Sequence, residues 1–299
     1  MIPFYLITGF LGSGKTTFLK EFLNQHADTQ KIAVIQNEFA EAGIDGRELQ
    51  QSSWKFDLLE VNKGSVFCVC LFSDFREQLR KFIDDTQPDL VVLEATGLAD
   101  PLAITELLTD DELQQRSYLA GVWCIADARN FRMVKELKAT RNQLLIADTI
   151  LLNKSDLADE NTLEQIKSEL KGINPIAEIR TTSYCRLNIS LGNKTHIPQV
   201  TGDPSGPPAA LYTIVFRSPY PVKQANLDYL LSIADEEVYR LKGYIVTEND
   251  ETLMIQSVCG LTTLHPVEKQ PFGTEIIAIG RKKIDLNLIL RTALIIQKK

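Results

Sequence analysis

A glycine-rich loop close to the N-terminus constrains the fold more than any other feature of this sequence. Residues 9–17 read GFLGSGKTT and fit the pattern G-x-x-x-x-G-K-[ST], which gains its meaning from a strand before it and a helix after it. An apolar run, FYLI at 4–7, precedes the loop, and a helical pattern at 15–25 follows it. Glycines let backbone N–H groups turn toward phosphate oxygens, and the helix N-terminus adds partial positive charge. The loop therefore predicts a P-loop nucleotide-binding fold.

Each residue type in this loop has an expected role. Lys15 is expected to reach the β- and γ-phosphate oxygens, Thr16 to bind magnesium, and Thr17 to contact the α-phosphate. The residues predicted to surround the phosphates are Gly9, Gly12, Ser13, Gly14, Lys15, Thr16 and Thr17.

The first part of the chain, residues 1–195, alternates short apolar runs with helical patterns. Most runs are apolar throughout, which suits parallel strands covered on both faces. The alternation predicts a doubly wound α/β sheet. The expected strands are 4–7, 31–36, 57–61, 89–95, 121–127, 148–153 and 177–182, and the expected helices are 15–25, 72–84, 101–108, 131–138 and 161–171.

A second, smaller domain is expected at 209–299. The preceding segment, 192–208, is rich in Gly, Pro and polar residues and reads as an exposed linker. An α+β domain with an antiparallel sheet is predicted from strand and helix patterns in the order β-α-β-β-β-α, with a hairpin turn between 246 and 252. The strands are expected at 210–216, 238–247, 252–258 and 275–280, the helices at 222–234 and 286–296, and His265 in a loop.

Two residues at the end of the run DLVVLEA extend the predicted site. Glu94 ends a predicted central strand, where an acidic side chain faces the nucleotide crevice and can hold magnesium or its water shell. Gly97 follows three residues later, and its amide can approach the γ-phosphate and respond to its presence.

The sequence N-K-S-D at 153–156 follows the apolar run DTILL and predicts guanine recognition. Asp156 can accept hydrogen bonds from the ring N1–H and the exocyclic amine of guanine, and adenine offers neither donor on that edge. The stem of Lys154 can lie along the base, and Asn153 can tie this loop to the phosphate loop. Ser183, after the next strand, is a candidate to close the base pocket. GTP or GDP with Mg²⁺ is therefore the expected ligand.

Charge and cysteine usage exclude several classes of partner and compartment. The formal net charge of -7 argues against nucleic-acid binding, for which a basic stripe is expected. No segment approaches 18 consecutive apolar residues and no signal peptide is recognised, so we expect no membrane partner. Five cysteines with only one close pair do not form a secreted disulfide framework, and a cytoplasmic location is expected.

Taken together, these motifs resemble the CobW-like family of P-loop GTPases, which are relatives of the UreG and HypB metallochaperones. The resemblance covers most of the chain, since 240–245 also resembles the family's C-terminal domain. It implies GTP hydrolysis coupled to delivery of a metal ion, often zinc or cobalt, to a client metalloprotein or cofactor-assembly enzyme. The stretches that carry it are TGFLGSGKTT (8–17), QNEFAEAGID (36–45), EVNKGSVFCVC (60–70), LEATGLADP (93–101), IADARNF (125–131) and ADTILLNKSDL (147–157).

The resemblance also implies which further residues act. Glu38, Glu41, Asp45 and a G-C-x-C-C motif lie near the nucleotide in the family. Catalysis is assigned to Lys15, Thr16, Glu94, Glu41 and Asp45, with Glu41 and Asp45 as candidates to orient the attacking water.

The cysteine motif departs from the family pattern. This chain has Ser65 and Phe67 where the family has cysteines, so only Cys68 falls on a family position and Cys70 is shifted. Two thiolates at C-x-C can bind a soft cation, but a closed tetrahedral zinc site needs four ligands. Glu38, Glu41, a histidine or a second subunit in a homodimer are candidate sources of the others. The alternative is that both cysteines are small buried side chains.

Three functions therefore stay open. The first is a GTP-hydrolysing metallochaperone, and the second is a GTP-dependent assembly chaperone without metal transfer. The third is a P-loop kinase for a small molecule, against which the N-K-x-D loop stands. Metal stoichiometry separates the first two, and a preference for ATP would indicate the third.

Overall fold

The computed structural model describes residues 1–38, 54–62, 72–97, 113, 115–191, 212–258, 261–269 and 273–280. By their contacts, the residues form two compact units, Met1–Ile173 with Ala177–Asn193 and Asn174–Ile176 with Lys194–Lys299. The predicted linker 192–208 lies outside the described residues, and the domain limits 1–195 and 209–299 stay predictions. None of the described helices has the length and apolar character needed to cross a membrane.

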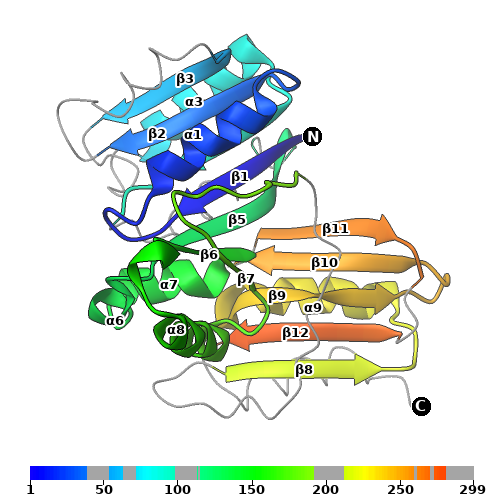
Figure 1. Cartoon of the computed structure of the whole chain (residues 1–299). Coiled ribbons are helices and arrows are strands. Elements are labelled where there is room, and N and C mark those ends of the chain that lie inside the picture. The colour runs from blue at the N-terminus through cyan, green and yellow to red at the C-terminus, as the bar shows by residue number, and fades with distance from the viewer. Residues whose placement is uncertain are drawn as a thin grey trace. The chain divides into compact units, whose positions relative to one another are not determined.

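The first unit is built on a parallel sheet with the strand order β3-β2-β4-β1-β5-β6-β7 (Figure 1). β4 and β6 are buried at every position, which explains why these stretches are continuous apolar runs. The doubly wound α/β fold predicted from the sequence is confirmed. The strands are β1 (Ile2–Thr8), β2 (Ile32–Glu38), β3 (Phe56–Asn62), β4 (Leu90–Glu94), β5 (Ser117–Asp127), β6 (Thr149–Asn153) and β7 (Glu178–Thr181).

Helices cover both faces of this sheet, and the alternation of side chains along β5 separates the two cores. Trp123 packs with Tyr5 and Phe22 beneath α1 on one face, with the Tyr5 and Trp123 rings stacked 4.9 Å apart. Cys124 packs with residues of α7 and α8 on the other face. The helices of this unit are α1 (Lys15–His26), α3 (Phe72–Thr86), α6 (Phe131–Val134), α7 (Lys138–Ile146) and α8 (Glu160–Ile173), with a 3₁₀ turn η2 (Ser155–Leu157).

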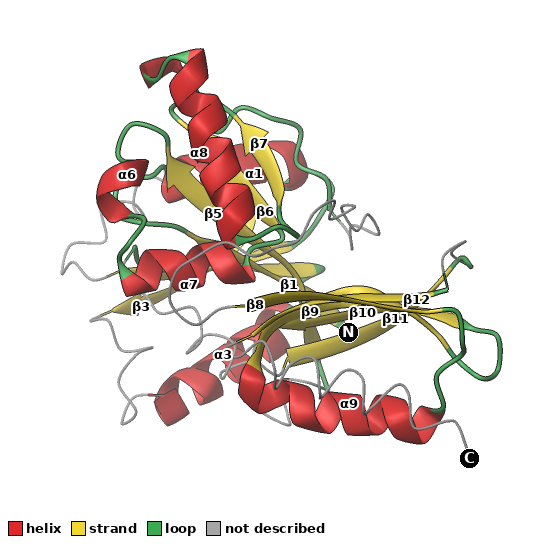
Figure 2. Cartoon of the chain, turned by 90° about the horizontal axis from the view of Figure 1, so that it is seen from below, coloured by secondary structure: helices red, strands yellow, loops and turns green. Residues whose placement is uncertain are grey.

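The second unit holds an antiparallel sheet in the order β11-β10-β9-β12-β8, with α9 along one face (Figure 2). Leu227 and Leu230 of α9 pack with Leu241 and Ile276 of the sheet. The separate antiparallel domain is thus confirmed. Its elements are β8 (Tyr212–Ser218), α9 (Gln224–Glu237), β9 (Val238–Val246), β10 (Thr252–Val258), β11 (Leu261–Val267) and β12 (Thr274–Gly280).

Two local predictions are wrong. The helix expected at 131–138 ends at Val134, and a separate helix, α7, begins at Lys138. α7 buries the polar residues Thr140 and Gln143, so its buried face has no apolar periodicity. His265 lies in β11 rather than in a loop, because β11 is an edge strand and an edge strand tolerates the proline that follows it. The helices expected at 101–108 and 286–296 lie outside the described residues.

Candidate nucleotide-binding site

The phosphate loop connects the carboxyl end of β1 to α1. Gly14 has φ 110°, and a Cβ atom at this residue would lie 2.5 Å from Asn153 Nδ2, so only glycine fits. Lys15 is buried at 8% exposure, and its Nζ donates to the Phe10 carbonyl oxygen at 3.2 Å. A buried ammonium group on a loop of this shape is placed to pair with phosphate oxygens.

The other predicted phosphate-loop residues also lie in this turn. Gly9 and Gly12 have positive φ angles of 138° and 70°. Ser13 is buried, and its Oγ has no hydrogen-bond partner within the described structure. Thr17 is exposed on the first turn of α1. The loop therefore has both backbone turns and a buried hydroxyl that a bound anion can satisfy.

A hydroxyl and a carboxylate meet beside the loop. Thr16 Oγ1 donates to Glu94 Oε1 at 2.7 Å, and the amide of Gln36 donates to Glu94 Oε2 at 3.0 Å. Glu94 is buried at the end of β4, next to β1 in the sheet. These are hard oxygen donors of the kind that Mg²⁺ prefers, so the residues fit a magnesium ion.

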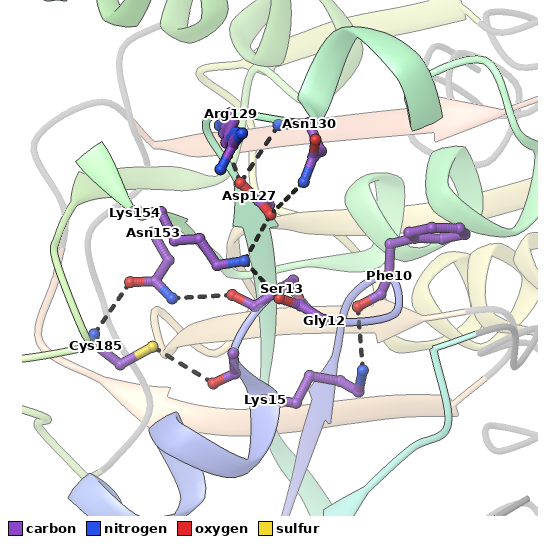
Figure 3. A network of polar contacts seen from close by, with 11 residues as sticks. Phe10, Gly12, Ser13, Lys15, Asp127, Arg129, Asn130, Asn153, Lys154 and Cys185 are labelled. Atoms are coloured by element: carbon purple, nitrogen blue, oxygen red, sulfur yellow. Dashed lines mark hydrogen bonds and ion pairs between the residues drawn. The ribbon is translucent and has the colours of Figure 1, made fainter. Parts of the chain in front are cut away.

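The base-recognition loop is fastened to the phosphate loop by side chains (Figure 3). Asn153 Nδ2 donates to the Ser13 carbonyl oxygen at 2.9 Å, and Lys154 Nζ donates to the Gly12 carbonyl oxygen at 2.8 Å. Asp156 is exposed, and its backbone N–H donates to Ser183 Oγ at 3.3 Å. Asn153, Lys154, Asp156 and Ser183 therefore lie around one surface beside the phosphate loop.

Asp127, at the end of β5, belongs to this site although it received no role from the sequence. Its Oδ2 lies 2.8 Å from Lys154 Nζ, and its Oδ1 accepts the backbone N–H of Arg129 at 2.9 Å (Figure 3). Burial by itself would raise the pKa of Asp127, but hydrogen bonds from Lys154 and Asn130 and the charge of Lys154 hold it below its ordinary value. The signal was present, because Asp127 ends an apolar strand as Glu94 does.

Cys185 is a second residue that the sequence interpretation left without a role. Its backbone N–H donates to Asn153 Oδ1 at 3.1 Å, and its Sγ lies 3.5 Å from the Gly14 carbonyl oxygen. Burial raises the pKa of the Cys185 thiol to about 12, so the side chain packs as a neutral group. Tyr184 and Cys185 both have φ 55°, a backbone conformation that is uncommon for these residues, and the Asn153 contact restrains the backbone N–H of Cys185.

The transition-metal ligands expected from the resemblance are not tested by this geometry. Glu38 is the last residue of β2, and Glu41, Cys68 and Cys70 lie outside the described residues, as does Asp45, a candidate to orient the attacking water. Within the described ranges, no group of three or more His, Cys, Asp or Glu side chains is placed to hold a metal ion.

Gly97 lies against the phosphate loop. A Cβ atom at Gly97 would be 2.5 Å from the backbone nitrogen of Leu11, so the close approach requires glycine. The predicted γ-phosphate sensor and the phosphate loop are therefore in contact.

Comparison with known proteins agrees with this arrangement. Residues 3–181 match the family described as CobW/HypB/UreG, nucleotide-binding domain, and residues 211–293 match the cobalamin synthesis protein cobW C-terminal domain. The zinc chaperone YjiA of Escherichia coli K12 is 34% identical over 194 residues, covering 62% of this chain and 59% of that protein. The zinc chaperone YeiR of the same strain is 38% identical over 155 residues, covering 50% of this chain and 46% of that protein.

The matched part of the chain thus spans about half the length of these curated relatives. A crystal structure of Zn(II)-bound YjiA GTPase from E. coli superposes with a TM-score of 0.62 at 24% identity, covering 100% of this chain and 99% of that chain, which shows a common fold. With the family match extending over residues 3–181, the chain belongs to the CobW/HypB/UreG family of nucleotide-binding proteins.

Proposed function

We propose that this protein binds GTP with magnesium, hydrolyses it to GDP and phosphate, and uses that cycle to deliver zinc to a client metalloprotein. The observation that carries the proposal is the base-recognition loop fastened onto the phosphate loop, with Asn153 bonded to Ser13 and Lys154 bonded to Gly12. This connection supports simultaneous recognition of guanine and of the phosphates.

Guanine selectivity rests on Asp156. Its side chain is exposed at the start of η2, while its backbone N–H is held by Ser183 Oγ at 3.3 Å. The carboxylate is therefore free to accept from both guanine donors while the loop that carries it stays in place. Adenine bound at the same place would cover this carboxylate without offering it donors, and a polar group buried without a partner costs about 1–3 kcal/mol.

Hydrolysis transfers the γ-phosphoryl group to water. A bond forms between the water oxygen and the γ-phosphorus, and the bond from that phosphorus to the β–γ bridging oxygen breaks. When bound, magnesium neutralises charge on the phosphate oxygens. Thr16 and Glu94 would hold it, and Lys15 would move from the Phe10 carbonyl oxygen to the β- and γ-phosphates. Glu41 and Asp45 stay candidates to orient the water.

Zinc is proposed as cargo, and cobalt is the alternative ion. The names of the relatives YjiA and YeiR support zinc. Cys68 and Cys70, with Glu38 or Glu41, are the proposed ligands, completed by a second copy of the chain if a homodimer forms. A site with so few protein ligands should exchange its ion readily, which suits delivery.

Zinc binding by the purified full chain, measured with GTP and with GDP, tests the metal role. We expect about one ion per subunit, or one per two subunits in a dimer, with weaker binding in Cys68→Ser and a smaller loss in Cys70→Ser. Cys124→Ser, at a buried thiol on β5, is the matched control. If the Cys68→Ser/Cys70→Ser double variant binds zinc as the wild type does and its GTP turnover responds equally to zinc, these cysteines are structural.

A further inference from the structure

Gln143 is a fully buried polar side chain that the proposed function does not use. It lies on α7 at 0% exposure, and its Nε2 donates to the Gly97 carbonyl oxygen at 3.2 Å. The two residues are far apart in sequence, so the contact joins α7 to the segment that follows β4. Because a buried amide is costly without hydrogen bonds, a glutamine here needs a partner such as this carbonyl.

Gly97 is held from two directions. Its backbone lies so close to Leu11 that an added Cβ would be 2.5 Å from the Leu11 nitrogen and 2.8 Å from the Leu11 Cα. Gln143 holds the carbonyl oxygen of the same residue. Gly97 is therefore positioned between the phosphate loop and α7.

The space beside Gln143 is not completely filled. A small cavity of about 20 Å³ lies between the phosphate loop and α7, and its lining includes Phe10, Leu11, Thr140 and Gln143. Thr140 Oγ1 is buried and has no hydrogen-bond partner in the described part of the chain. Glycine has more rotational freedom than any other residue, so the hydrogen bond to the Gly97 carbonyl oxygen supplies a restraint that the absent side chain cannot.

We propose that Gln143 is a positioning residue that lets the site distinguish GTP from GDP. By holding the Gly97 carbonyl oxygen, Gln143 restricts rotation about the backbone bonds of Gly97 and keeps its N–H oriented for the γ-phosphate. In this proposal Gln143 acts through Gly97 rather than by direct contact with the nucleotide. This inference rests on the proposed GTP binding, and it assigns triphosphate selectivity to a contact in the interior of the protein.

The position of α7 gives this contact a second consequence. α7 ends at Ile146, and β6 begins at Thr149 and ends at Asn153 of the base-recognition loop. A backbone shift at Gly97 can therefore be transmitted through Gln143 to α7, which is followed by β6, the strand that carries the base-recognition loop. GTP and GDP share the guanine base, so their affinities differ through the groups that reach the γ-phosphate, which here include Lys15 and the Gly97 N–H.

The test uses Gln143→Met in the full chain, because methionine keeps the length of the side chain and removes the N–H donors. Affinities for GDP and for a non-hydrolysable GTP analogue are measured with Mg²⁺, together with the melting temperature. We expect affinity for the GTP analogue to fall about 3- to 10-fold, the size of one net hydrogen bond, and GDP affinity to change less than about 2-fold. Asn142→Ala, on the partly exposed side of the same helix, should change neither affinity.

Other results distinguish an error in the role of Gln143 from an error in the proposed function. If Gln143→Met weakens GDP and the GTP analogue equally, Gln143 is a structural residue and the inference is wrong. Should that variant not fold, Gln143→Asn keeps the amide but is too short to reach Gly97, and the same selective loss is expected. If the wild-type protein binds no guanine nucleotide, the proposed function itself is contradicted. If the wild type binds but both variants keep its ratio of GTP-analogue affinity to GDP affinity, only the role of Gln143 is contradicted.

Discussion

The two sides of the nucleotide site are held in different ways. On the base side, Asn153 and Lys154 reach across to carbonyl oxygens of the phosphate loop, and Asp127 fixes the Lys154 ammonium group. On the γ-phosphate side, the contacts include those of Thr16 and Gln36 with Glu94 and that of Gln143 with Gly97. In the proposed function, direct ties between the two loops preorganise recognition of the base, whereas discrimination of the γ-phosphate involves the N–H of Gly97, which Gln143 positions from α7.

Lys15→Ala should have the largest effect and should weaken both sides of the comparison together. Lys15 is proposed to donate charge-assisted hydrogen bonds to both the β- and the γ-phosphate, and at about 1.5–3 kcal/mol each the two contribute about 3–6 kcal/mol. We expect GTP affinity to fall at least about 100-fold while the circular dichroism spectrum stays unchanged. Unaltered nucleotide affinity would refute the assignment of the phosphate loop.

Asp156→Asn should affect the base side alone. The amide presents a donor to a guanine N–H, and the expected loss is about 2–4 kcal/mol for GTP and for GDP alike. A xanthine nucleotide, with a carbonyl group in place of the amine, should recover part of that affinity. Competition binding with guanine, xanthine and adenine nucleotides measures the effect. An Asp156→Asn protein with wild-type preference for guanine would rule out this role.

Asp127→Asn should also lower the affinity for guanine nucleotides, but by less than Asp156→Asn does. The amide oxygen can still accept the backbone N–H groups of Arg129 and Asn130, but the NH₂ group in place of Oδ2 loses the ion pair with Lys154 and the hydrogen bond from the Asn130 side chain. We expect GTP and GDP affinities to fall together by about 3- to 10-fold, in contrast to the selective loss expected for Gln143→Met. Asp159→Asn, at an exposed carboxylate that caps α8, serves as the control. If Asp127→Asn changed the ratio of GTP affinity to GDP affinity, the base side and the γ-phosphate side of the site would not be independent.

The pH dependence of stability should show the smallest effect. The folded-state pKa of Asp127 lies below its ordinary value, so this carboxylate stabilises the fold fully above about pH 3.9. That contribution is lost as the pH falls through the lowered folded-state pKa. The difference in unfolding free energy between wild type and Asp127→Asn should therefore shrink on acidification, as followed by urea unfolding. A difference that grows as the pH falls would contradict the ion pair.

Residues whose roles are local could be predicted from the sequence. The loop at 9–17 and the strand ending at Glu94 are continuous patterns, because a buried parallel strand is apolar at every position. These apolar runs predict the parallel sheet. The sheet also predicts that Asn153 lies near the phosphate loop, since the carboxyl ends of parallel strands share one edge.

Residues whose roles depend on distant partners could not be predicted. Gln143 and Thr140 make α7 look polar, and only the folded chain shows that the amide of Gln143 meets the Gly97 carbonyl oxygen. Cys185 reads as an isolated cysteine, yet its backbone N–H supports Asn153. The strand β11 was missed for a related reason, because a His-Pro pair is typical of loops unless the strand lies at an edge.

Calorimetric titration of the wild-type chain with GTP and with ATP, each in the presence of Mg²⁺, tests the central claim most directly. Lys154 joins the base loop to Gly12 of the phosphate loop and to Asp127, so selectivity should not require a large rearrangement. We expect one GTP per chain, bound at least about 30-fold more tightly than ATP, as the loss of two guanine hydrogen bonds implies. Equal affinity for the two nucleotides would contradict the account.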